Sequence, residues 1–446
     1  MKVADPSPVE SKPPLQPSRG QARFAFSVLL VINILNYADR FVLPAILRRI
    51  QASPAQGGLG LTNFEAGLIG SSFLLVYALA TLPIGVWADR GVRKNIVAIC
   101  VGIWSIATVL AGITRNFLQL FLVRSVLGIG EAGYAPASLS LLGDFFPKEK
   151  RGRVLSYWSS GTLIGTAIGF SIGGLVADRL GWRWAFYVVG LPGLIAAFLI
   201  WRSLEPKRGA FDSEQEGEQD VELETAHGSI GKDFFGTVKQ LLHIPTYWML
   251  LGALTFSFFT IGGASFWLPN YFGKTFNLSE APAGAISGAI LVIGGLVGTI
   301  VGGWLADVAQ KRRQEGRLLV SSLGLLLGAP LIFVALLIHT LPLFSVVFLL
   351  AAMFLSFCTG PLNAVIQDII KPDLRATAVG FSLLFAHILG DASAPSLIGL
   401  LADKSSLNAA LLVTAPTGLL IAGIVCLIGL RTVARDMRNM ETQLHK

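Results

Sequence analysis

Long apolar stretches recur along the whole 446-residue chain and restrict its fold more than any other feature. Each is long enough to cross the hydrocarbon core of a bilayer, which takes roughly 20 apolar residues in a helix. Charged residues make up only 14% of the chain, against roughly 25% in a soluble domain. We therefore expect an all-α membrane protein with twelve transmembrane helices, at 24–47, 63–87, 96–113, 117–143, 153–176, 184–204, 245–272, 281–305, 318–339, 342–369, 376–401 and 408–431.

A polar segment separates these stretches into two sets of six. Residues 205–233 hold nine of the 27 acidic residues of the chain, a composition that favours a flexible linker. The sequence thus predicts a disordered cytoplasmic tail at 1–23, an N-terminal six-helix bundle at 24–204, a cytoplasmic linker at 205–244, a C-terminal six-helix bundle at 245–432 and a cytoplasmic tail at 433–446.

The basic residues predict the orientation. If the N-terminus is cytoplasmic, cytoplasmic segments hold 26 of the 35 Lys and Arg residues, outside loops hold 7, and Arg40 and Arg124 lie within spans. Cytoplasmic loops of membrane proteins carry such an excess of positive charge. Orientation in a bilayer therefore explains the net charge of +8 better than binding to nucleic acid does.

Short motifs repeat between the two halves. Gly85–Asp89 recurs as Gly303–Asp307, and Gly174–Asp178 recurs as Gly399–Asp403, 225 residues later. Asp144 precedes Arg151 by the same seven residues that separate Asp368 from Arg375. Internal repeats of this kind are typical of secondary transporters.

These motifs resemble those of a known family. The stretch Gly85-x3-Asp89-Arg90-x2-Arg93-Lys94 is similar to the loop 2–3 signature of the major facilitator superfamily, and Arg124-x3-Gly128-x-Gly130 is similar to its fourth-helix motif. Within that superfamily, Asn36–Phe41, Gly128–Ala132 and His387–Ala392 resemble Spinster-type lipid transporters. The resemblance implies the major facilitator fold, with two six-helix halves.

Three charged residues fall at compatible depths in the bilayer. Asp39 lies in the first span, and Arg124 and Glu131 lie two helical turns apart in the fourth. A charge near the bilayer centre costs about 2.5–3.5 kcal/mol even on the lenient insertion scale, so these groups must pair or face water. They form either a static salt bridge between two helices or a set in which Asp39 and Glu131 exchange protons while an Arg tunes them and binds an anion.

Other polar and aromatic residues are candidates for binding substrate. His387 and Asp391 are spaced i, i+4 and so share a helix face; they form either a local polar pair or part of a substrate cavity. Phe259 and Trp267, in an aromatic-rich seventh span, either face lipid or line an apolar cavity wall. Arg40 and Arg124 are the candidates for holding an anionic head group.

The resemblance also implies a gate at the cytoplasmic side. Asp89 lies at a helix end beside Arg90 and Arg93. The plain alternative is an ordinary positively charged cytoplasmic loop. In the family interpretation, Asp89 and its repeat Asp307 are latches that pair with basic residues such as Arg153 or Arg375 when this side is closed.

Two glycine ridges complete the candidates, Gly165/Gly169/Gly173 and Gly294/Gly298/Gly302, which are small-xxx-small faces that permit close helix packing. In the resembled fold their two helices meet across the halves, so the ridges predict either a sliding seam there or fixed packing.

The function implied is secondary active transport by alternating access, coupled to protons. The expected substrate is an amphipathic lipid such as a lysolipid or a sphingosine-1-phosphate-like molecule. The alternatives are a multidrug or organic anion transporter of the same superfamily and a transporter-like membrane receptor. We expect a monomer in a bacterial inner membrane with both termini cytoplasmic.

We expect no enzyme activity, metal or cofactor. No Cys/His spacing suggests zinc, and the match to G-x-G-x-x-G at 128–133 lies inside an apolar helix with no preceding strand.

Overall fold

The computed structural model describes residues 17–211 and 234–444, and within these ranges all regular structure is helical. The predicted tail up to residue 16, residues 212–233 of the predicted linker and the last two residues lie outside the described residues. The first half contains α1 (Arg19–Gln51), η1 (Pro54–Gln56), α2 (Asn63–Arg90), α3 (Arg93–Ala111), α4 (Phe117–Ala132), α5 (Tyr134–Phe145), α6 (Lys148–Leu180) and α7 (Trp182–Trp201).

The second half follows the same order. It contains α9 (Phe234–Leu241), α10 (Pro245–Thr275), α11 (Glu280–Gln310), α12 (Gly316–Leu337), α13 (Leu341–Leu355), η2 (Ser356–Cys358), α14 (Thr359–Ile369), η3 (Pro372–Leu374), α15 (Arg375–Ala386), η4 (His387–Asp391), α16 (Ala394–Lys404) and α17 (Leu407–Leu444). Helix α9 lies inside the predicted linker, and α17 continues through the predicted C-terminal tail as far as Leu444.

Eleven spans of the described chain are long and apolar enough to cross a membrane. The remaining predicted span, the fourth at 117–143, is divided at Gly133 into α4, of 16 residues, and α5, of 12 residues. The corresponding span of the second half is divided in the same way, into α13, η2 and α14. Pro136 and Pro361 are each the third residue of the helix after the break, a position at which the missing proline N–H costs no helical hydrogen bond.

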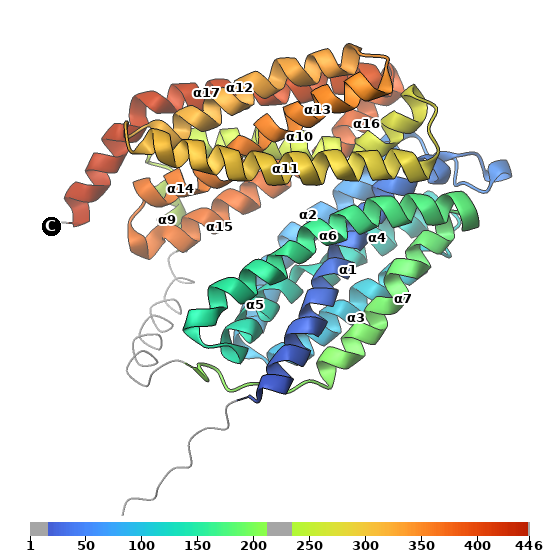
Figure 1. Cartoon of the computed structure of the whole chain (residues 1–446), viewed down its shortest axis with the longest axis horizontal. Helices are drawn as coiled ribbons and strands as arrows, with labels where there is room; N and C mark the ends of the chain where they lie inside the picture. The colour runs from blue at the N-terminus through green and yellow to red at the C-terminus, as the bar shows by residue number, and fades with distance from the viewer. Residues whose placement is uncertain (1–16, 212–233, 445–446) are drawn as a thin grey trace, which may run out of the picture.

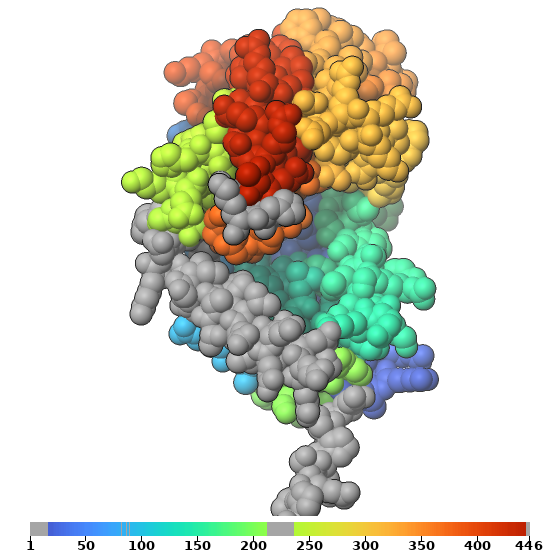
Figure 2. Space-filling model, turned by 90° about the vertical axis from the view of Figure 1, so that its left-hand side faces the viewer, coloured from blue at the N-terminus to red at the C-terminus, as the bar shows by residue number. Residues whose placement is uncertain are grey.

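The two halves form two layers of helices that meet on one side of the molecule (Figure 1). We call this side, where α1 ends and α2 begins, the outer side, and the opposite side, toward the C-terminus and α9, the inner side. Across the layers α6 packs on α11, and α2 packs on α16. On the inner side a recess separates the halves (Figure 2).

The buried apolar residues divide in the same way. One core joins the second half to the outer end of the first half, including Val42, Ile46 and Ile50 of α1. A separate core belongs to the first half alone and includes Ala25 and Leu29 near the other end of α1. The halves therefore share a packed interior at the outer side and have separate interiors at the inner side.

The glycine ridges pack differently from the expectation that they form a seam between the halves. A Cβ at Gly169 would lie 2.5 Å from the Ala38 carbonyl oxygen, so this ridge holds α6 against α1 of the same half. A Cβ at Gly298 would lie 2.2 Å from the Met353 carbonyl oxygen, so the second ridge holds α11 against α13. Because each ridge is occupied by a partner in its own half, the alternative of a sliding seam was wrong, and the contacts agree with the alternative of fixed packing.

Candidate functional site

A cavity of about 680 Å³ lies between the two halves, at the depth where α1 carries its charged residues. Most of its lining is apolar and comes from both halves, including Phe73 of α2, Phe258 and Phe266 of α10, Leu291 of α11 and Phe348 of α13. Its polar lining includes Arg40, Arg124, Thr166 and Asp391. The cavity thus combines extended apolar walls with a few charged groups, as small-molecule sites commonly do.

Two ion pairs lie beside this cavity. Arg40 Nε is 2.6 Å from Glu131 Oε2, and Arg124 Nη1 is 3.5 Å from Asp39 Oδ1. The Asp39, Glu131 and Arg124 side chains are at most 1% exposed, whereas that of Arg40 is 18% exposed. The predicted charged set is therefore assembled, with Arg40 as its fourth member. With both carboxyls ionised its net charge is zero, which permits burial at this depth.

Neutral side chains hold the charged groups in place. Thr108 Oγ1 donates a 2.5 Å hydrogen bond to Asp39 Oδ2. The Arg40 guanidinium carbon lies 4.6 Å from the ring centroid of Tyr77, 5.1 Å from that of Tyr37 and 5.5 Å from that of Phe73. Aromatic faces attract a guanidinium, and more strongly where water is excluded. Arg40 thus has one carboxylate and three rings as neighbours.

The sequence reasoning missed these supporting residues. Tyr37 lies within the Asn36–Phe41 motif, but a tyrosine in a transmembrane helix has no feature in the sequence that predicts a contact with Arg40. Thr108 lies in an apolar helix and Tyr77 in a stretch without charges, so only the tertiary structure reveals their contacts.

His387 and Asp391 form a hydrogen bond of 2.9 Å between Nδ1 and Oδ2. Both belong to η4, a π-helical segment within the span that α15 begins and α16 ends; such segments are frequent at functional sites. Asp391 lines the cavity, whereas His387 packs its ring edge-on against Tyr77 and Phe258. The pair thus lies where α2 faces the second half, with Asp391 on the side of the cavity.

The two aromatic candidates of α10 do not line the cavity. Trp267 is fully buried and donates its indole N–H to the Pro395 carbonyl oxygen at 3.1 Å. Phe259 packs within the second half. The adjacent residues Phe258 and Phe266 face the cavity instead, because one residue turns a side chain by about 100° around a helix.

The predicted gate residues have different environments. Arg93 is 1% exposed and contacts Asp144 and Glu205 of its own half. Asp307 contacts Arg317, also within one half. The Asp89 side chain lies outside the described residues, although its backbone is in α2.

The three remaining gate candidates are arginines. Arg90 and Arg153 are exposed, and Arg375 Nε donates to the Ile370 carbonyl oxygen at 3.2 Å. Nothing in the described contacts joins the predicted gate residues of one half to those of the other.

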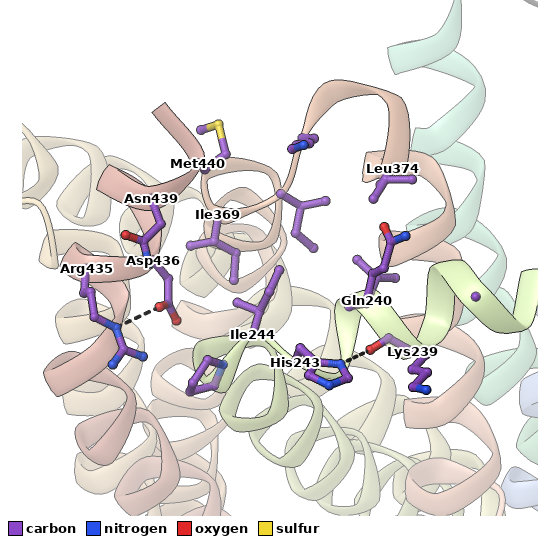
Figure 3. A pocket seen from close by; sticks show the side chains of 15 residues that line it. Lys239, Gln240, His243, Ile244, Ile369, Leu374, Arg435, Asp436, Asn439 and Met440 are labelled. Atoms are coloured by element: carbon purple, nitrogen blue, oxygen red, sulfur yellow. Dashed lines mark hydrogen bonds and ion pairs between the residues drawn. The ribbon is translucent and has the colours of Figure 1, made fainter. Parts of the chain in front are cut away.

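A second cavity, of about 790 Å³, lies at the inner end of the second half (Figure 3). It is lined by α9, the end of α14 and α17, and the hydrogen bond from His243 to the Lys239 carbonyl lies at its rim. None of the predicted site residues lines it, so we assign the candidate site to the central cavity. In the described residues, no group of three or more His, Cys, Asp or Glu side chains could hold a metal ion.

Comparisons with known proteins agree with this architecture. The family model of the Major Facilitator Superfamily matches residues 29–395. Protein spinster of Drosophila melanogaster is 27% identical over 391 residues, which are 85% of this chain and 62% of that protein, so the chain spans less than two thirds of that relative. The probable sphingolipid transporter spinster homolog 1 of Arabidopsis thaliana is 26% identical over 451 residues, covering 93% of this chain and 89% of that protein.

A solved structure shares the fold. The inward-facing, unoccupied structure of a bacterial homolog of the human lysosomal transporter Spinster superimposes with a TM-score of 0.76 at 24% identity, covering 96% of this chain and 99% of that one.

The ion pair of Arg40 and Glu131 generates a stability prediction. Arg40→Gln leaves Glu131 buried without its partner, which should lower the free energy of unfolding by about 3 kcal/mol. The double variant Arg40→Gln/Glu131→Gln removes both charges and should regain most of that loss. Thermal unfolding in detergent measures both. Arg435→Gln is the control, because Arg435 is 56% exposed and should lose at most about 1 kcal/mol. If the double variant lost as much free energy of unfolding as Arg40→Gln and Glu131→Gln lose together, that result would contradict this interpretation.

Proposed function

The chain belongs to the Major Facilitator Superfamily and is a multi-pass membrane transporter similar to Spinster proteins, and we propose that it carries an amphipathic anionic lipid by proton-coupled alternating access. The observation that carries the proposal is the cavity itself, which two arginines line among long apolar walls. Each of these arginines pairs with a carboxyl group that is buried beside the cavity. Lysolipids and sphingosine-1-phosphate-like molecules have the matching chemistry of one charged head and one apolar tail.

The head and the tail take different parts of the cavity. Arg40 and Arg124 both line it, and a guanidinium presents a planar fork of donors that suits phosphate. The tail lies along the apolar lining toward Leu291 and Phe348. Asp391, with His387 behind it, adjoins the head as a second polar contact. A multidrug or organic anion transporter remains the alternative, and a transporter-like receptor is a further one.

Alternating access explains the unequal packing of the two sides. The shared core at the outer side and the separate cores at the inner side correspond to a state open to the inner side. The excess of basic residues supports a cytoplasmic position for this inner side, both chain ends and the linker. Asp89 and Asp307, with Arg90, Arg93, Arg153 and Arg375, then become gate residues of the opposite state. We place the protein in a bacterial inner membrane as a monomer.

Coupling follows from the balance of charge. With both carboxyl groups ionised the four side chains carry no net charge, so an arriving anionic head group adds an uncompensated negative charge. A proton bound by Asp39 or Glu131 removes that excess. Binding of the lipid and binding of the proton therefore favour each other, and by linkage each changes the affinity of the other by the same factor.

One prediction of this proposal concerns the head group of the lipid. Arg124→Lys keeps the charge but loses the planar fork of donors, so it should weaken binding of a phosphorylated lysolipid by about tenfold or more and leave its dephosphorylated form nearly unaffected. Titration of the purified protein with each lipid measures this difference. Arg183→Lys, on a partly buried arginine at the outer end of α7, is the control. Equal losses for the two lipids would show that Arg124 is structural.

Another prediction of this proposal concerns the coupling of transport to protons. Asp39→Asn and Glu131→Gln mimic the protonated carboxyl groups with little change of volume. Each should abolish uptake of lysolipid driven by a pH gradient in proteoliposomes, while exchange at equal pH on both sides survives. Acceleration of both single variants by the gradient, as expected for the unmodified protein, would place proton coupling elsewhere, with His387 and Asp391 as the next candidates.

A further inference from the structure

The motif Gly-x3-Asp occurs at the outer ends of two helices, as Gly174–Asp178 of α6 and Gly399–Asp403 of α16. Each copy contacts the first turn of a helix in the opposite half. Asp178 accepts hydrogen bonds from the backbone N–H groups of Glu280 (3.2 Å) and Ala281 (2.9 Å), at the start of α11. Asp403 accepts them from Asn63 (2.9 Å) and Phe64 (2.8 Å), at the start of α2.

These two carboxylates satisfy backbone donors that have no partner inside their own helix. The side chain of Ser279, the N-cap residue of α11, makes no capping hydrogen bond, so Asp178 from the other half provides the cap. In α2 the Thr62 hydroxyl accepts a hydrogen bond from the backbone N–H of Glu65. Asp403 accepts those of the two preceding residues, Asn63 and Phe64. A negative charge at a helix N-terminus is also favoured by the helix dipole.

The glycines permit this approach, and they do so reciprocally. A Cβ at Gly174 would lie 2.2 Å from the Glu280 carbonyl oxygen, and one at Gly399 would lie 2.3 Å from that of Asn63. In the facing helices, a Cβ at Gly284 would lie 2.2 Å from the Phe170 carbonyl oxygen, and one at Gly67 would lie 2.2 Å from that of Pro395. Real Cβ atoms essentially never come this close, so each contact requires glycine on both helices.

The inner copies of the motif provide a contrast. A Cβ at Gly303 or at Gly85 would meet nothing within 4 Å, and Asp307 bonds Arg317 of its own half. The motif thus joins the halves at the outer side, whereas the described inner residues Gly85, Gly303 and Asp307 make no such contact between the halves.

We propose that Asp178 and Asp403, each with its glycine, are a matched pair of outer latches that hold the outer side closed and must release when the cavity opens outward. This inference rests on the alternating access of the proposed function but not on its substrate or its coupling ion. Arg48 and Arg49 of α1 strengthen the α11 latch, because Arg48 lies 2.6 Å from Glu280 and Arg49 lies 3.2 Å from Asp178. At the α2 latch the nearby cation is Lys274, whose Nζ is 3.2 Å from Asn63 Oδ1.

Distances between spin labels test the latches without any substrate. Cysteines at Ala55 and Ser405 place labels on the two halves at the outer side, and cysteines at Lys150 and Arg312 do so at the inner side; all four positions are exposed. The three native cysteines are buried, so background labelling is low. The full-length protein in lipid nanodiscs is measured with and without Asp178→Ala/Asp403→Ala.

Removal of a helix cap typically changes an equilibrium about fivefold. We therefore expect the double variant to raise the ratio of outward-open to inward-open molecules by about 25-fold, with longer outer distances and shorter inner ones. Asp307→Ala removes the same residue type from the same motif at the inner side. Because Asp307 is proposed as a gate residue of the outward-open state, its removal should not lengthen the outer distances. Unchanged distances in a monodisperse double variant would overturn the proposal.

A glycine variant keeps the test decisive if the double variant does not fold. Gly399→Ala places a methyl group against the Asn63 carbonyl and should lengthen the outer distances, whereas Gly303→Ala should not. Identical distances in these two variants would also overturn the latch. Absence of lysolipid transport alongside the expected shifts would refute the proposed substrate and leave the latch standing.

Discussion

Four charged side chains inside the first half, three buried and one partly buried, determine what the rest of the molecule must provide. Arg40 and Arg124 neutralise Glu131 and Asp39, and a charge that loses its partner at this depth is left uncompensated, which costs free energy. The rings around Arg40 and the hydroxyl of Thr108 fix the groups in position. An anion or a proton that enters the adjoining cavity changes this balance directly, so the site is sensitive to both proposed cargoes.

Helix α1 connects this charge set to the closed outer side. It carries Asp39 and Arg40 beside the cavity, and Arg48 and Arg49 beside the start of α11. Nine residues of helix separate Asp39 from Arg48, about 13 Å, and Pro44 lies between them within the helix. Because proline removes a helical hydrogen bond, it is a natural position for a bend. A displacement of α1 would therefore alter the charge set and the outer contacts together.

Sequence reasoning was strongest where the bilayer imposes the pattern. The apolar spans, the internal repeat and the family were all predicted, because lipid permits few alternatives to helices. It failed for contacts between helices, because the sequence of one helix does not reveal which helix packs against it. The aromatic lining comes from Phe258 and Phe266 instead of Phe259 and Trp267, and the glycine ridges face helices of their own half. The partner of Glu131 proved to be Arg40, which the spacing of α4 alone cannot reveal.

The coupling of lipid binding to protonation of Asp39 or Glu131 is tested by measuring whether protons are taken up when the lipid binds. The purified protein in weakly buffered nanodiscs is mixed with a phosphorylated lysolipid, and the proton balance is followed with a pH indicator. We expect uptake of protons by the unmodified protein and none by the Asp39→Asn/Glu131→Gln variant, although that variant still binds the lipid. Lipid binding to the unmodified protein without any proton uptake, or equal uptake by the variant, would contradict this coupling.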